Sequence, residues 1–489
     1  MSLENYFKTY SENTIGNDLF FESPYGKKKV VYADWTASGR LYAPIEKQIS
    51  DIIGPYVGNT HTETTLTGSS MTHAYHLALK TIKRHVNAHS SDVIISSNSG
   101  MTGVVNKFQR ILGFRIHEKY KDLVQLSEEE KPLILVTHME HHSNQTSLLE
   151  TIGELMIIPS DDNGLVDLQG LETLLKQFSY KKTKIAAVTS YSNVTGIATP
   201  YHQIAEIMHN FGGLCFVDFA CAAPYINIDM HPQVAAQKLD AIYFSPHKFL
   251  GGPGSTGILI FDSSLYKNKI PDCPGGGTVE WTNPWGRHKY VEDIEKREDG
   301  GTPAFLPTIK VALCIKLKEQ MGVEKMLERE EELKNIIWPG LEKIEGLHIL
   351  AGNIKERLGI FSVYIDNLHY NLAVRILNDR FGIQVRGGCS CAGTYGHYLL
   401  HVDQSLSSEI TERISQGDLS CKPGWLRFSI HPVMTDDEVR FILNAIKQLA
   451  ENHWEWRKDY QYNPHTNEYT HKDEDPCKMR SFVESWFNF

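Results

Sequence analysis

The sequence predicts an α/β protein with a mainly parallel sheet and a second, smaller lobe. In the middle of the chain, short β-rich runs alternate with stretches of helical period, which is typical of βαβ units. From about Pro303 onward the sequence changes to long charged helices. The chain has 489 residues, which is more than one ordinary core of roughly 100–200 residues accommodates. We therefore expect at least two packed lobes.

Five apolar runs are the predicted strands of the large lobe. Each is short, rich in β-branched or aromatic residues, and followed by polar or small residues and then a helical period. They cover residues 92–97, 132–137, 184–190, 214–219 and 240–245. Ligands of open α/β sheets bind at the carboxyl ends of the strands, so the residues just after these runs are the expected place for a site.

The smaller lobe is predicted from a charged helix over 322–344, a strand over 358–365 and a further helix over 371–382. The tail after Glu451 is rich in aromatic residues, which is unusual for a free tail, so we expect it to pack against the body. The predicted division has four parts: an N-terminal segment joining the small domain (1–45), a large ligand-binding domain (46–305), a small domain (306–450) and a C-terminal extension (451–489).

Composition narrows the functional class. Hydrophobic residues make up 41% and charged residues 22%, as in globular proteins, and the net charge of -10 comes with no basic cluster, which argues against nucleic acid as a partner. Neither a signal-like N-terminus nor about 18 consecutive apolar residues occur, so we expect a cytoplasmic protein without membrane spans. Eight irregularly spaced cysteines do not suggest a disulfide framework.

Lys248 is the central candidate for chemistry. It ends a predicted strand in the segment SPHKFLGGPGSTG (245–257), where a glycine-rich turn follows. A lysine there can condense with an aldehyde, and Ser245 and His247 can donate hydrogen bonds to a phosphate on the same ligand. Taken alone, an exposed lysine beside a loop is the more common situation. The residues around it favour the ligand-binding interpretation.

Two further groups follow predicted strands. Asp218 ends an apolar strand, where an unpaired carboxylate would be costly to bury, and a protonated pyridine nitrogen would be a natural partner. The alternative is an aspartate that caps a helix or turn. Gly100 and Thr102 lie where a helix begins, so free backbone N–H groups and a hydroxyl could face an anion.

His141, in the segment MEHHSN, could stack on a flat ring. The alternatives are a solvated histidine pair or a metal ligand. Adjacent histidines cannot easily bind one ion together, and no cysteine or carboxylate stands at a familiar zinc spacing, so we expect no metal.

The C-terminal candidates are a thiol and two arginines. Arg386, Cys389 and Cys391 lie in the glycine-rich segment VRGGCSCAGTYGH (385–397), which suits a mobile loop with a nucleophilic thiol whose pKa a nearby cation would lower. A Cys-x-Cys pair could instead be half of a metal site or a redox pair, but no second pair exists. Arg427 lies in a half-buried predicted strand and needs an anionic partner, which a substrate carboxylate would supply.

Together these segments resemble the class V aminotransferase family, especially its cysteine desulfurase and selenocysteine lyase branch, over roughly residues 30–450. Nine motifs occur in the family's order: YADWTASG, GMTG, MEHH, SNVTGIATP, VD-x-A, SPHK, GGTP, VRGGCSCA and WLRFS. The resemblance implies an α/β enzyme of fold type I, with a mainly parallel seven-stranded sheet in the large domain and a smaller α+β domain. It also implies pyridoxal 5′-phosphate as cofactor and a homodimer with the active site at the interface.

The resemblance also assigns roles to single residues. It implies that Lys248 forms the Schiff base, that His141 stacks on the ring and that Asp218 meets the pyridine nitrogen. It places Asn193 beside the ring hydroxyl. The implied phosphate ligands are Thr102, Ser245 and His247, with Thr302 contributed by the other subunit, and Gly100 is expected beside them at the start of its helix.

On the substrate side, the resemblance implies that Arg427 holds the carboxylate and that Arg386 and His61 lie near it. Cys391 matches the thiol that accepts sulfur and becomes a persulfide. Two departures stand out: Cys221 replaces a glutamine of the family, and Thr62 replaces an arginine. About twenty extra residues also separate Cys391 from Arg427.

The leading functional interpretation is removal of sulfur or selenium from cysteine or selenocysteine with release of alanine, with a sulfur-acceptor protein as a possible partner. A second interpretation is another reaction on the same cofactor, such as transamination, β-elimination or racemisation, because one fold supports several outcomes. A third is a binding or regulatory protein that keeps the fold without turnover.

Overall fold

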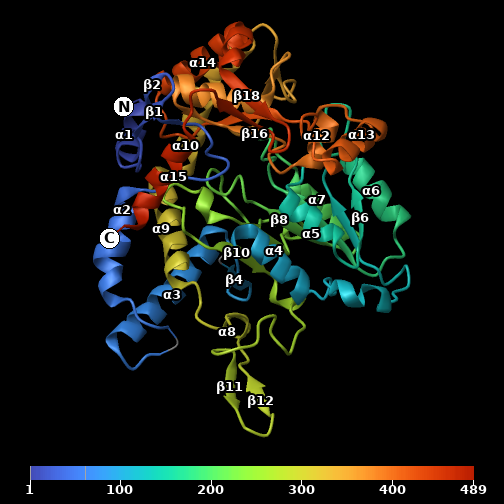
Figure 1. Ribbon diagram of the computed structural model, residues 1–489. Helices are drawn as coiled ribbons and strands as arrows, with labels where there is room; N and C mark the ends of the chain where they lie inside the picture. Colours follow the sequence, from blue (N-terminus) through green and yellow to red (C-terminus); the bar gives the residue numbers. More distant parts are fainter. Residues whose placement is uncertain (1, 61, 98, 489) are drawn as a thin grey trace.

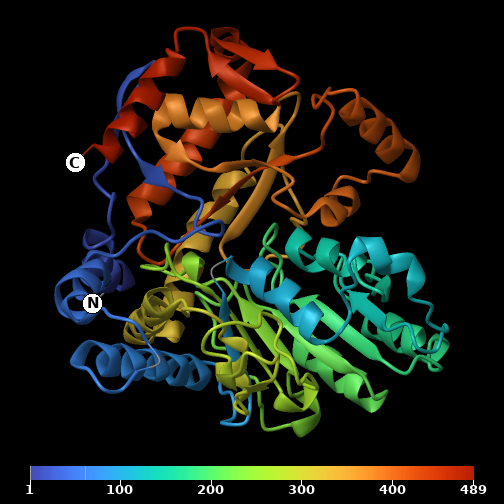
Figure 2. The same ribbon diagram turned by 60° about the horizontal axis from the view of Figure 1, so that its bottom comes forward.

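The computed structural model describes residues 2–60, 62–97 and 99–488, and its large lobe is built around a seven-stranded sheet (Figures 1 and 2). Six strands run in one direction, and β10 is antiparallel to its neighbours β4 and β9, so the predicted mainly parallel α/β sheet is confirmed. In spatial order the strands are β4 (Val93–Ser97), β10 (Gly257–Phe261), β9 (Ala241–Phe244), β8 (Leu214–Asp218), β7 (Lys184–Thr189), β5 (Leu133–Val136) and β6 (Glu154–Ile157).

Alternating strand residues build a core on each face of this sheet. Ile134 faces one core, which α4 and α5 cover, and Leu135 faces the other, which α3, α6, α7 and α9 cover. Both faces are therefore dry, as expected for a mainly parallel sheet. The helices are α3 (Leu66–His85), α4 (Gly100–Ile111), α5 (His142–Leu149), α6 (Leu168–Gln177), α7 (Tyr201–Asn210) and α9 (Phe305–Met321).

The smaller lobe is an antiparallel sheet packed against helices (Figure 2). Its apolar face contacts α10 and α14 through side chains such as Leu333 and Ile446. Its strands, in spatial order, are β13 (Leu347–Ile349), β14 (Ile360–Ile365), β17 (Trp425–Ser429) and β16 (Arg386–Gly388). Its helices are α10 (Val323–Leu341), α11 (Tyr370–Ile376), α12 (Gly393–Leu399), α13 (Gln404–Ser415) and α14 (Asp436–Trp456).

The N-terminal residues lie against this smaller lobe. Strand β3 (Val31–Tyr32) pairs in parallel with β15 (Ile383–Gln384), and Asp34 forms a bridge to Ser429. The segment YADWTASG is thereby held between the two lobes. The other N-terminal elements are α1 (Leu3–Glu12), β1 (Phe20–Ser23), β2 (Gly26–Lys29) and α2 (Ala43–Lys47).

The C-terminal extension forms a hairpin of β18 (Tyr460–Asn463) and β19 (Glu468–His471), followed by α15 (Pro476–Glu484). Tyr460 is buried, and the hydroxyl of Tyr25 donates to Asp459 Oδ2 at 2.7 Å, so the hairpin is anchored to the body. On and after α15, Phe482 and Trp486 remain exposed. The four-part division of the chain stays a proposal.

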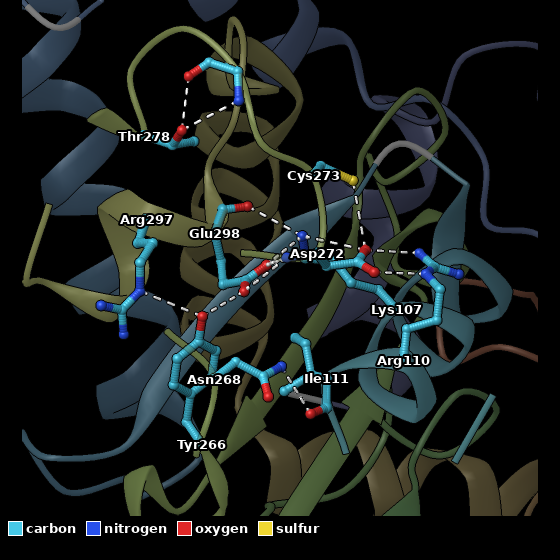
Figure 3. A network of polar contacts seen from close by, with 11 residues as sticks. Lys107, Arg110, Ile111, Tyr266, Asn268, Asp272, Cys273, Thr278, Arg297 and Glu298 are labelled. Atoms are coloured by element: carbon cyan, nitrogen blue, oxygen red, sulfur yellow. Dashed lines mark hydrogen bonds and ion pairs between the residues drawn. The ribbon is translucent and has the colours of Figure 1, made fainter. Parts of the chain in front are cut away.

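A buried polar network fixes the segment that follows β10 (Figure 3). Glu298 accepts from Tyr266 at 2.7 Å and pairs with Lys107 of α4 at 2.8 Å, while Asp272 pairs with Arg110 at 2.6 Å. This segment carries the projecting hairpin of β11 (Val279–Thr282) and β12 (His288–Tyr290), α8 (Ile294–Glu298) and Thr302 (Figure 1). Within the described residues, no helix combines the length and apolar character needed to cross a bilayer.

Candidate active site

A cavity of about 230 Å³ lies at the carboxyl ends of the central strands, and most of the residues singled out in the sequence line it. Thr302 is exposed and Cys389 is half-buried, and neither lines the cavity, while His61 lies outside the described residues. The predicted residues along its wall are Gly100, Thr102, His141, Asn193, Asp218, Ser245, His247, Lys248, Arg386, Cys391 and Arg427.

Strand ends bring these groups together. Asp218 is the last residue of β8, and Ser245 and Lys248 follow β9 directly in a single tight turn. The backbone of Gly39, in YADWTASG, donates to the carbonyl of His247 at 2.9 Å. A Cβ at Gly39 would stand 1.9 Å from the carbonyl oxygen of Phe249, so only glycine permits this approach to the lysine turn.

Burial sets the protonation of the central groups. It lowers the pKa of Lys248, an effect that the nearby carboxylate of Asp218 opposes. Burial also lowers the pKa of His141 to about 3, with Lys248 adding to the effect, and His141 Nδ1 accepts a hydrogen bond from the backbone of Ser143 at 3.1 Å. His141 is therefore a neutral flat ring, and Lys248 is an amine whose uncharged, nucleophilic form is accessible.

Asp218 is a nearly dry carboxyl group. It is 2% exposed and, among the residues that the structure describes, accepts one hydrogen bond, from the backbone N–H of Ala220 at 2.7 Å. Burial raises its pKa to about 6, because one hydrogen bond does not replace the lost hydration. A cationic ligand nitrogen at this position would restore the charge balance of the ionised group.

Because Asp218 is buried, we expect Asp218→Asn to stabilise the cofactor-free protein. The folded-state pKa is raised from 3.8 to about 6, so ionisation opposes folding, and wild-type stability falls as the pH rises through this range. The asparagine variant should be more stable by up to about 3 kcal/mol at pH 8, and by less as the pH approaches 5. Urea unfolding at both pH values measures this, and a less stable variant at pH 8 would contradict it.

The start of α4 forms an anion-binding corner. Gly100 adopts a φ of 61°, and the backbone N–H of Met101 donates to Ser245 Oγ at 2.9 Å, which leaves the hydroxyl hydrogen of Ser245 free to donate to a ligand. The hydroxyls of Thr102 and Ser143 lie 2.6 Å apart at the same corner. Helix N-termini with adjacent hydroxyls bind phosphate groups.

Four buried polar atoms on the cavity wall have no hydrogen-bond partner among the described residues: Thr36 Oγ1, Asn193 Oδ1, Ser390 Oγ and Arg427 Nε. Buried polar groups normally have partners, so these atoms indicate a polar ligand. With an amine, a buried carboxyl, a neutral imidazole and an anion corner in the same cavity, the donor set fits pyridoxal phosphate.

Arg427 has an anionic partner within the chain, which the sequence analysis missed. Asp34 Oδ1 lies 2.9 Å from Arg427 Nη2, and Asp34 Oδ2 lies 3.1 Å from Arg386 Nε. Arg427 also donates to the carbonyl of Asn193 at 3.0 Å. One carboxylate therefore orients both arginines and leaves a net positive charge at the substrate end. Asp34 lies within the motif YADWTASG, and this motif could have indicated that the residue belongs to the site.

We expect Asp34→Asn to destabilise the protein, because Arg427, whose side chain is 3% exposed, loses a charged hydrogen-bond partner. The free energy of unfolding should fall by about 1.5–3 kcal/mol in urea denaturation of the cofactor-free protein. Asp18→Asn is the matched control. The side chain of Asp18 is 94% exposed and lies 3.7 Å from Lys29 Nζ, so this ion pair should contribute less than about 1 kcal/mol. Equal stability of the two variants would contradict the prediction.

The cavity also holds two thiols in different environments. Cys391 is exposed at its mouth. Cys221 is buried beside Lys248 and donates to the carbonyl of Tyr191 at 2.9 Å, and burial raises its pKa to about 12. Cys221 is thus a neutral thiol, whereas Cys391 is accessible to substrate. Among the residues placed by the structure, no cluster of three or more histidine, cysteine or acidic side chains is arranged to hold a metal ion.

Comparisons with known proteins identify the family of this chain. The family model for class V aminotransferases matches residues 31–442. A probable cysteine desulfurase of Staphylococcus aureus is 28% identical over 429 residues, covering 87% of this chain and 93% of the relative, and one of Halalkalibacterium halodurans is 28% identical over 367 residues, covering 74% and 84%.

Solved structures share the fold. The apo cysteine desulfurase of Thermococcus onnurineus superimposes with a TM-score of 0.70 at 24% identity, covering 86% of this chain and 95% of that one. A NifS-like protein of Rickettsia africae gives 0.66 at 18% identity, covering 86% and 99%. The matched family model spans most of the chain and both lobes, so this chain is an enzyme of the class V aminotransferase family.

Proposed function

We propose that this chain is a pyridoxal-phosphate-dependent cysteine desulfurase or selenocysteine lyase, which removes sulfur or selenium from its amino-acid substrate and releases alanine. The observation that carries the proposal is the meeting of Lys248, Asp218 and Cys391 on the wall of one cavity. The named relatives at 28% identity support the same activity.

The residues that would hold the cofactor surround Lys248. Asp218 would face the pyridine nitrogen, His141 would lie on the ring, and the buried Oδ1 of Asn193 would accept from the ring hydroxyl. The proposed phosphate ligands are Gly100, Thr102, Ser245 and His247, with Thr302 of a second copy of the chain, since Thr302 is exposed and does not line its own cavity.

Pyridoxal phosphate supplies an aldehyde that condenses with amines and a ring that withdraws electrons from the neighbouring carbon. The protein supplies the rest. Lys248, with its lowered pKa, can exchange a proton with the substrate at its Nζ, and Arg427 and Arg386 orient the substrate carboxylate. We place His61 near the same substrate in this proposal because of the family resemblance alone.

Cys391 would accept the sulfur atom. Its thiolate attacks the substrate sulfur, an S–S bond forms, the C–S bond breaks, and its electron pair remains on the substrate carbon, which then takes up a proton. The net result is cysteine plus a thiol giving alanine plus a persulfide, so atoms and electrons balance without another reactant. A sulfur-acceptor protein would then remove the sulfur from Cys391.

We further propose that the enzyme works as a homodimer in the cytoplasm. Thr302 supports a shared site, because it is exposed, does not line its own cavity and lies four residues after Glu298, which the network of Figure 3 anchors.

The proposed function is tested by incubating the cofactor-loaded protein with L-cysteine and, separately, with L-selenocysteine. Alanine should form in equal amount to the sulfide or selenide released under reducing conditions. Formation of pyruvate without alanine, or no product from either amino acid, would contradict it.

A further inference from the structure

The loop that carries Cys391 has an unusual backbone. Ser390 and Cys391 have φ values of 51° and 58°, two consecutive left-handed residues that are not glycine. Each such residue costs of order 1–2 kcal/mol relative to ordinary backbone, so the conformation requires compensating contacts. These contacts come from the other lobe.

His142, the first residue of α5, makes two of them. Its backbone N–H donates to the carbonyl of Cys391 at 2.7 Å, and its ring Nε2 accepts from the backbone N–H of Gly393 at 2.8 Å. His142 thus binds the loop at Cys391 through its backbone and at Gly393 through its ring. Since Nε2 accepts, the ring must be neutral at that atom, and burial lowers the pKa of His142, with Lys422 adding to the effect.

Two side chains hold the flanks of the loop. Asn193 Nδ2 donates to the carbonyl of Ser390 at 2.7 Å, and Thr394 Oγ1 donates to Gln145 Oε1, one turn along α5, at 2.7 Å. The sequence pattern suggested a mobile glycine-rich loop, whereas the structure fixes it from both sides. The large lobe thus determines where the exposed thiol stands at the mouth of the cavity.

We propose that His142 is a positioning residue that latches the Cys391 loop across the two lobes and so holds the thiol over the substrate. The inference rests on the proposed function for its consequence in sulfur transfer, while the latch itself is a property of the protein alone. His142 does not line the cavity around Lys248, and its ring Nε2 is engaged by the backbone N–H of Gly393.

The test compares His142→Asn with His142→Gln. Both introduce a neutral amide, but the shorter asparagine cannot reach the Gly393 N–H, whereas the carbonyl oxygen of glutamine extends about as far as Nε2. In cofactor-free protein, hydrogen exchange of peptides covering residues 389–394 should accelerate about tenfold in His142→Asn and stay near the wild-type rate in His142→Gln.

In cofactor-loaded protein, persulfide formation on Cys391 at saturating cysteine should slow about tenfold in His142→Asn, with an unchanged KM and absorption spectrum, and recover in His142→Gln. Equal exchange in the two variants, or wild-type exchange in His142→Asn, would overturn the latch. If the wild type forms no persulfide while the exchange difference is present, the proposed function fails and the latch stands.

Discussion

Lys248→Ala is expected to abolish covalent attachment of pyridoxal phosphate and to lower turnover of cysteine by at least about a thousandfold, because the variant lacks the amine proposed to condense with the aldehyde and to move the substrate proton. The purified wild type should be yellow and should retain the cofactor on Lys248 after borohydride reduction. In the variant, peptide mass spectrometry should find no reduced adduct at position 248.

The control for this prediction is Lys267→Ala, a change at an exposed lysine that does not line the cavity. It should keep the colour, the adduct and the activity of the wild type. An adduct on another lysine in the wild type, or undiminished activity of Lys248→Ala, would disprove the assignment of Lys248.

Cys391→Ala is expected to lower alanine formation from cysteine by about a hundredfold or more, while the cofactor stays bound. The thiol is the proposed sulfur acceptor, whereas the proposed ligands of the cofactor do not include Cys391. Alanine and sulfide assays with an absorption spectrum of each variant separate the two effects.

Cys477→Ala is the matched control, because Cys477 is also exposed but lies on α15, away from the cavity. It should behave as the wild type. If Cys391→Ala released sulfur from cysteine as fast as the wild type, the proposed transfer of sulfur to Cys391 would be wrong. The thiol would then be incidental to the reaction of this class V enzyme.

Most strands that the sequence predicted in the large lobe are buried on both faces, since a continuous apolar run is typical of such a strand. β5, β7 and β8 are examples, and the family resemblance supplied the seven-stranded sheet. β6 was not predicted because its residues are only partly buried at a sheet edge. β10 was not predicted because it follows directly on the glycine-rich turn after Lys248.

The site was largely predictable because its groups follow strands whose carboxyl ends meet at one edge. Asp34 and His142 were not, since their contacts depend on how the two lobes pack. Asp34 reaches Arg427 across nearly the whole length of the chain, and the ring of His142 meets Gly393 only when the lobes are assembled. Local patterns carry no information on such long-range pairs.

One measurement tests the proposed roles of Lys248 and Cys391 together. The cofactor-loaded protein reacts briefly with L-cysteine in the absence of reductant, and the mass of the peptide that contains Cys391 is then measured. The account predicts one added sulfur atom on Cys391 in the wild type and none in Lys248→Ala. An unmodified Cys391 in a wild type that produces alanine, or the same added sulfur in Lys248→Ala, would contradict it.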